Sequence, residues 1–228
     1  MAVDHSGWDE LLAKYVKSSL GAVNGFAYGA VTAPDKTALK DYLARLQATK
    51  ASALDDDEQR AFWINLYNAL TVDVVVDHYP IKSIRDVVKG GPWSMPRVTV
   101  EGRTLSPNDI EHGILRKLWR DPRLHYAVNC ASASCPNLMP RAFTGAALEA
   151  MLAQGARDYI NHARAVEVSD GGLRCSQIFS WYAKDFAGDE KGLLAHLQQY
   201  ASPELKDQLS KVEHISGYDY DWSLNDAT

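Results

Sequence analysis

The sequence has few cysteines, no long apolar run and no excess of basic residues. Only three of its 228 residues are cysteine, too few for a disulfide framework, and the odd number leaves at least one thiol unpaired within the chain. No stretch approaches the roughly 20 apolar residues that a transmembrane helix needs, so we expect no membrane span. Acidic residues outnumber basic ones by 29 to 24, a net charge of −5, which disfavours nucleic acid as a partner. Internal repeats and low-complexity segments are also absent, which excludes repeat and disordered classes.

The start of the chain is compatible with two compartments. Met1 to His5 contain neither the basic nor the apolar part of an export signal. As given, the sequence indicates a cytoplasmic protein, whereas a removed export signal would indicate a periplasmic one. The cysteine count does not decide between the two.

The remaining composition is that of a globular protein with a sizeable core. Hydrophobic residues make up 46% of the chain and charged residues 23%, both ordinary values. We expect a single helix-rich α+β domain, residues 1–228, with a small antiparallel sheet. Helical spacing and capping residues predict helices over 6–20, 35–46, 56–78, 106–119, 144–162, 177–184 and 190–200. Two hairpins are predicted, 97–100 with 103–105 and 165–168 with 173–175, together with an extended run over 124–128. The helix from Asp56 to His78 is apolar almost all round, so it should be the buried central helix.

The segment from Asn129 to Pro136 carries two of the three cysteines among small residues that would let a ligand approach the backbone. A cysteine in such a loop becomes a nucleophile when a nearby histidine lowers its pKa or accepts its proton. His125 lies five residues before Cys130, and His112 lies on the preceding predicted helix. A buried pair of free thiols, or a disulfide that closes the loop, would give the same pattern.

The same side chains also suggest a metal site. Cys130, Cys135, His112 and His125 would form a Cys2His2 set for zinc. The paired CxxC spacing of zinc ribbons is absent, however, and a domain of this size needs no structural metal. We therefore expect no metal and no other cofactor.

The predicted helix after Ser106 carries several polar residues of interest. On a helical wheel His112 shares a face with Leu115 and Trp119, which predicts apolar surroundings. Glu111 or Asp109 could orient the imidazole, and Arg116 could hold a substrate carboxylate as a two-pronged donor. The alternative is a core histidine satisfied by one hydrogen bond.

Asn65 and Asn68 lie in the most apolar predicted helix. A buried amide costs free energy unless it is hydrogen-bonded. We expect their partners to be backbone groups, for example of the cysteine loop, or a substrate.

Five separate motifs are spread along the chain: Phe62 to Thr71, Tyr79 to Ile84, Asp109 to His112, His125 to Pro136 and Tyr220 to Asn225. Together they resemble the domain-of-unknown-function family 547 across nearly the whole chain. The resemblance implies a bacterial protein, often exported, or a plant protein with a fused leucine-zipper region, and it implies no activity. Plant-type members of the family depart from the pattern near the second cysteine, which argues against Cys135 as the nucleophile.

The hypothesis that combines these patterns is a cysteine-dependent hydrolase or acyltransferase that acts on an amide bond in a small molecule or peptide. The expected catalytic residues are Cys130, His112, His125 and Glu111, and the expected substrate-binding residues are Asn65, Arg116, Asn129 and Ser134. A distant papain-like or transglutaminase-like plan would fit, by analogy of fold alone. The alternative is a non-catalytic binding or scaffold domain in which the cysteines and histidines are structural.

Overall fold

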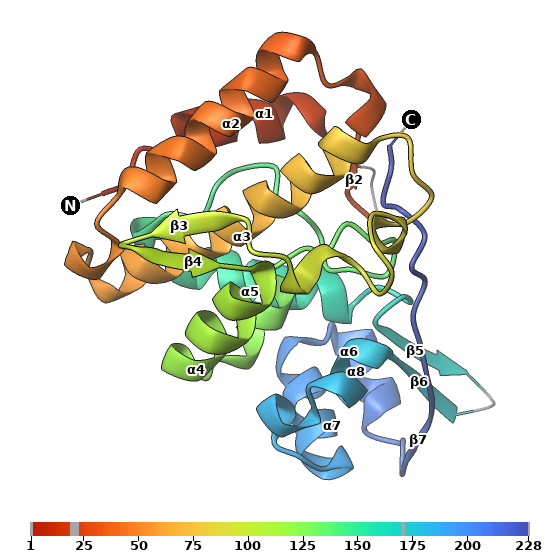
Figure 1. The fold of residues 1–228 in the computed structure, drawn as a ribbon. Coiled ribbons are helices and arrows are strands. Elements are labelled where there is room, and N and C mark those ends of the chain that lie inside the picture. The colour runs from red at the N-terminus through yellow and green to blue at the C-terminus, as the bar shows by residue number, and fades with distance from the viewer. Residues whose placement is uncertain (1, 19–22, 170–171, 228) are drawn as a thin grey trace.

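Helix α3 (Asp56–His78) runs through the middle of the computed structural model, which describes residues 2–18, 23–169 and 172–227 (Figure 1). Its first turn is acidic, and the Asp55 side chain accepts a hydrogen bond from the Glu58 backbone, an arrangement that stabilises a helix N-terminus. Phe62, Ile64 and Leu66 are fully buried. The prediction of a buried central helix is therefore confirmed.

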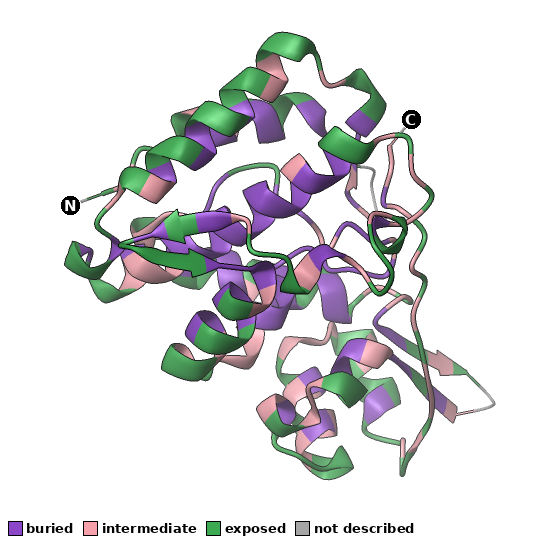
Figure 2. Cartoon of the chain, viewed as in Figure 1, coloured by how far each residue is buried: buried purple, intermediate pink, exposed green. Residues whose placement is uncertain are grey.

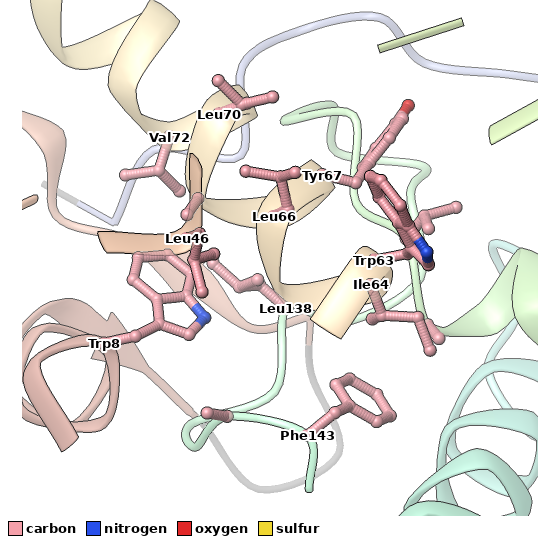
Figure 3. Packing of buried hydrophobic residues seen from close by; sticks show 14 of the residues in the cluster. Trp8, Leu46, Trp63, Ile64, Leu66, Tyr67, Leu70, Val72, Leu138 and Phe143 are labelled. Atoms are coloured by element: carbon pink, nitrogen blue, oxygen red, sulfur yellow. The ribbon is translucent and has the colours of Figure 1, made fainter. Parts of the chain in front are cut away.

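The N-terminal helices cover one side of α3. Helix α1 (Ser6–Tyr15) and helix α2 (Ala33–Ala48) meet where Trp8 stacks on Tyr42. Figure 3 shows Trp8 and Leu46 of these two helices packed toward the apolar side chains of α3, with Leu138 and Phe143 completing the cluster. Between α1 and α2 lie two short paired strands, β1 (Val16–Lys17) and β2 (Gly25–Phe26). Helix α1 is thus shorter than the predicted 6–20 because the chain extends into β1, and residues 19 and 20 lie outside the described part.

The first predicted hairpin is confirmed. Strands β3 (Val98–Val100) and β4 (Arg103–Leu105) pair antiparallel. Glu101 and Gly102 join them with φ values of 47° and 76°, the left-handed backbone that suits the twist of a two-residue hairpin turn.

The segment after this hairpin differs from the predicted continuous α-helix. Asp109–Leu115 form a π-helix, and α4 (Arg116–Trp119) continues from it. A π-helix bonds residue i to i+5 and so rotates side chains away from their α-helical positions. The wheel prediction for His112 is therefore wrong: its side chain is 39% exposed, whereas that of its neighbour Glu111 is 9% exposed.

The predicted extended run over 124–128 is also wrong. Pro122–Tyr126 form a 3₁₀ helix, and the Asp121 side chain accepts a hydrogen bond from the Arg123 backbone at its start. The fixed φ of Pro122 suits a first helical position. This short helix buries His125 and leads into the cysteine loop.

The C-terminal third forms a second, smaller unit of helices and a sheet. Its helices are α5 (Leu148–Ile160), α6 (Gln177–Trp181), α7 (Glu190–Tyr200) and α8 (Pro203–Leu209). Its strands are β5 (Val166–Ser169), β6 (Gly172–Ser176) and β7 (Ile215–Asp219), in that spatial order. The pair β5 and β6 is the second predicted hairpin, whose turn residues 170 and 171 lie outside the described part. Strand β7 was not predicted, and it pairs parallel to β6.

Two apolar clusters form the core. One lies around α3 and the other between α5, β6 and α7 (Figure 2). The chain after β7 then runs back along the molecule to β2 (Figure 1), where Asp226 pairs with Phe26. The helix-rich α+β prediction is confirmed. In the described part, no helix combines the length and apolar character needed to span a bilayer.

Candidate functional site

Asparagine side chains hold the cysteine loop to the central helix. The Asn68 amide of α3 donates to the Ala127 carbonyl at 2.9 Å and accepts from the Asn129 backbone at 2.8 Å. Asn129 in turn bonds the Pro136 carbonyl at 2.7 Å and the Ala131 backbone at 2.8 Å. Both ends of each amide are therefore occupied within the protein, so these two asparagines fix the shape of the loop.

Asn65 also fixes the backbone of a neighbouring segment, the one that contains Phe143. Its amide donates to the Phe143 carbonyl at 2.7 Å and accepts from the Phe143 backbone at 2.9 Å. The residue is fully buried and does not line the cavity described below. Of the two partners expected for Asn65, the backbone is the one observed.

The C-terminal segment lies against the outer side of the loop. Ala133 donates its backbone N–H to the Ser223 carbonyl at 2.8 Å, and the Ser134 hydroxyl accepts from the Asp221 backbone at 2.8 Å. These bonds position Tyr220. Ser134 is buried, and it anchors this segment to the loop.

The two cysteines of the loop lie in contact with each other. Their sulfur atoms are 2.9 Å apart, and the Cys130 backbone N–H donates to the Cys135 sulfur. The Cys130 sulfur is also 3.3 Å from the Ser132 hydroxyl and 3.2 Å from the Tyr220 hydroxyl. The Ser132 and Tyr220 hydroxyls are also hydrogen-bonded to each other, at 2.8 Å.

The two thiols have opposite electrostatic environments. Hydrogen bonds, first from Cys135 and then from Ser132 and Tyr220, lower the pKa of Cys130 from 9 to about 7 against the effect of burial. Burial, followed by the neighbouring Cys130, raises the pKa of Cys135 well above its ordinary value. A thiolate is the reactive form of cysteine, so Cys130 is the more reactive of the two.

The loop opens onto a cavity of about 300 Å³. Cys130 and Cys135 line it together with polar side chains of other elements, namely Ser94, Asn108, Glu111 and His125. Aromatic rings form much of the remaining wall, namely Tyr67, Trp93, Trp181, Tyr182, Tyr220 and Trp222. A mostly apolar cavity with a few converging polar groups is typical of a small-molecule site.

His125, which lines this cavity, forms a bonded pair with Asp185, which is not among the lining residues. The His125 Nε2 atom lies 2.7 Å from the Asp185 carboxylate, which also accepts a hydrogen bond from Arg116 at 2.7 Å. His125 and then Arg116 hold the pKa of Asp185 well below its usual range. Because an ionised carboxylate only accepts hydrogen bonds, we assign a proton to Nε2, which leaves Nδ1 as the basic nitrogen of the neutral ring.

Of the other residues expected at the site, one lines the cavity and two do not. Glu111 lines the cavity, and after the effect of burial its carboxylate helps to raise the pKa of Tyr182. Exposed His112 lies 2.9 Å from Arg116, and neither is among the residues that line the cavity. Arg116 is thus bonded to Asp185 and His112.

Sequence reasoning missed Tyr220, Tyr182 and Asp185. Tyr220 lies in one of the motifs that carry the family resemblance, which was the only signal for it. The third cysteine, Cys175, is buried in β6, and burial raises its pKa to about 12. Within the described residues no group of three or more histidine, cysteine or acidic side chains is arranged to hold a metal ion.

Comparison with protein families gives a match to the family described as "Protein of unknown function, DUF547" over residues 51–160. The resemblance is therefore confirmed over this range, which contains α3, the π-helix and the cysteine loop. No curated protein and no solved structure matches the chain.

Proposed function

We propose that this chain is a cysteine-dependent hydrolase or acyltransferase that acts on an amide bond in a small molecule or peptide. The supporting observation is that Cys130, with a pKa of about 7, shares one cavity with His125, which is bonded to Asp185. Near neutral pH a large fraction of such a thiol is thiolate, the form that attacks carbonyl carbon.

His125 is the acid and base of the proposed reaction. His125 accepts the Cys130 proton at Nδ1 as the thiolate forms. The Cys130 thiolate attacks the amide carbonyl and a C–S bond forms. His125 then gives this proton to the leaving nitrogen as the C–N bond breaks, which leaves a thioester on Cys130. In the second half His125 accepts a proton from water or from an acceptor nucleophile, whose oxygen or nitrogen displaces the sulfur. Asp185 orients the imidazole and stabilises its charged form, as the third member of such a constellation does.

Tyr67 is the group that we assign to the developing oxyanion. Its hydroxyl has no hydrogen-bond partner among the described residues, although the residue lines the cavity. Burial raises the pKa of this phenol well above its ordinary value, so it stays a donor. A single well-placed donor of this kind contributes about 10²–10³-fold to the rate. Asn129, expected from the sequence to bind substrate, has its amide bonded within the loop.

The aromatic wall indicates the kind of substrate. Trp181 and Trp222 lie 4.9 Å and 4.7 Å from the Tyr220 ring, measured between ring centres. These rings present flat apolar surfaces beside the nucleophile, which suits a substrate with a planar or apolar group next to the reacting bond. The buried Glu111 carboxylate is the acceptor for a substrate N–H group.

Acylation by p-nitrophenyl acetate tests the proposal. Reduced wild-type protein should release a burst of one p-nitrophenolate per chain and carry one acetyl group on Cys130, found by mass spectrometry of its peptides. His125→Ala and Tyr67→Phe should each slow the burst, and Cys130→Ala should abolish it. His112→Ala is the matched control, because this histidine is exposed, and its burst should equal that of the wild type.

A burst that persists in Cys130→Ala, or acetylation at lysines without acetylation of Cys130, would contradict the proposal. Equal burst rates in wild type and His125→Ala would remove His125 from it. Absence of any acyl-protein would favour the non-catalytic binding domain.

A further inference from the structure

The cysteine loop contains two thiols that differ in access while their sulfur atoms touch. Both thiols line the cavity, but Cys130 is partly exposed whereas Cys135 is only 3% exposed. The sulfur–sulfur distance of 2.9 Å is closer than two non-bonded sulfur atoms normally approach, and an S–S bond requires a further approach to about 2.05 Å. An accessible thiol backed by a buried second thiol is the arrangement needed for exchange with a disulfide in two steps.

We propose that Cys130 and Cys135 form a dithiol–disulfide couple that exchanges electrons with a small disulfide bound in the cavity. This activity goes beyond acyl transfer and does not require it. It assigns Cys130 as the attacking thiol and Cys135 as the resolving thiol.

The exchange balances without any further oxidant. The Cys130 thiolate attacks one sulfur of a disulfide R–S–S–R, and the S–S bond breaks as a Cys130–S–S–R bond forms. The first RS⁻ leaves and takes up a proton. Cys135 then loses its proton to solvent and attacks the Cys130 sulfur, which expels the second RS⁻. This second RS⁻ also takes up a proton from solvent. The protein has lost two hydrogens, and R–S–S–R has become two thiols. A small dithiol reductant reverses both steps.

The local electrostatics favour this order of events. Burial and then the neighbouring Cys130 raise the pKa of Cys135. When Cys130 enters a mixed disulfide it loses its negative charge, so the second of these causes disappears. Cys135 therefore becomes easier to deprotonate once its target has formed.

Cys175 takes no part in this couple. It lies in β6, where it pairs with Val166 of β5, and it is buried in the second apolar cluster. Burial raises its pKa to about 12. It therefore provides an internal control.

The test treats fully reduced protein with 2-hydroxyethyl disulfide under argon, quenches samples with acid, and alkylates the remaining thiols in denaturant. Wild-type protein should lose two hydrogens by intact mass and release two small thiols per chain. Peptide mapping should locate the new bond between Cys130 and Cys135, and dithiothreitol should restore both thiols. Cys175→Ser should behave like the wild type, and Cys130→Ser should not react. Cys135→Ser should stop at a mixed disulfide on Cys130 and release one thiol.

A wild-type protein that stops at the mixed disulfide, or that forms its internal bond with Cys175, would overturn the proposal. If Cys135→Ser does not fold, the wild-type time course decides, because a mixed disulfide must appear first and decay as the second thiol is released. The acylation burst is measured on reduced protein only. Loss of the burst with intact exchange would refute acyl transfer alone, and the reverse result would refute the couple alone.

Discussion

Cys130 should react with iodoacetamide at neutral pH as an activated thiol. Hydrogen bonds from Cys135, Ser132 and Tyr220 stabilise its thiolate and lower its pKa to about 7. The reaction rate should therefore follow a titration centred near pH 7 and level off above pH 8. An unperturbed thiol would continue to gain rate toward pH 10, because its pKa is about 9.

The size of the effect follows from two opposing terms. At pH 7 a thiol with a pKa of 7 is about half thiolate, whereas one with a pKa of 9 is about 1% thiolate, a gain of about 50-fold. A less basic thiolate is also a weaker nucleophile, by about 0.4–0.5 log units per pKa unit, which removes about 8-fold. The net gain at pH 7 is therefore about 6-fold. Partial burial of Cys130 lowers the alkylation rate by the same factor at every pH. The midpoint of the titration is therefore a more reliable measurement than the absolute rate.

The assay measures carbamidomethylation of the Cys130 peptide against pH by mass spectrometry, with the denatured chain as reference. Tyr220→Phe removes one donor to the Cys130 sulfur and should move the midpoint toward higher pH. Cys175→Ser should leave it unchanged. A midpoint between pH 8.5 and 9 in the native protein would refute the claim that the loop activates Cys130.

Two predictions concern stability. Asn65→Leu should lower the free energy of unfolding by about 1–3 kcal/mol, because the Phe143 backbone groups would stay buried without partners; an unchanged urea midpoint would contradict the bracing role. The pKa of Asp185 is held low in the folded state, chiefly by His125. The ionised carboxylate therefore stabilises the folded protein at any pH above the unfolded-state pKa of about 4. This stabilisation is lost as the pH falls from that value through the lower folded-state pKa. Urea midpoints measured from pH 7 down to pH 2 should therefore fall less in Asp185→Asn than in wild type, and equal slopes would argue against the assignment.

The elements that sequence reasoning predicted correctly are those with strong local signals. The all-round apolar composition of α3 located the buried helix, and glycine turns between alternating residues located the two hairpins. Local patterns failed in two situations, namely an unusual helix geometry and contacts between residues distant in sequence. The π-helix over Asp109–Leu115 was missed because an α-helical wheel assumes i to i+4 bonding. Strand β7 was missed because its partner β6 lies about 40 residues earlier, and a parallel pairing of this kind has no local signature.

The site was predicted only in part, because some of its residues are close in sequence and others are far apart. Cys130 and His125 line one cavity, and their closeness in sequence was the signal. Tyr220 lies 90 residues from Cys130 in the chain and reaches its sulfur only because Ser134 and Asp221 fasten the C-terminal segment to the loop. No composition or spacing argument could supply that contact.

The hydrogen-bond partners of the polar residues separate bracing from chemistry. A sequence motif cannot distinguish a polar side chain that binds a substrate from one that holds a loop, because in both cases it is a polar residue in a buried position. Asn65 and Asn129 have their amides bonded to the backbone, so binding a ligand would cost them bonds they already make. The Tyr67 hydroxyl and the Nδ1 atom of His125 have no such bond within the described part of the chain. The bonding capacity of these two groups is therefore left for a substrate.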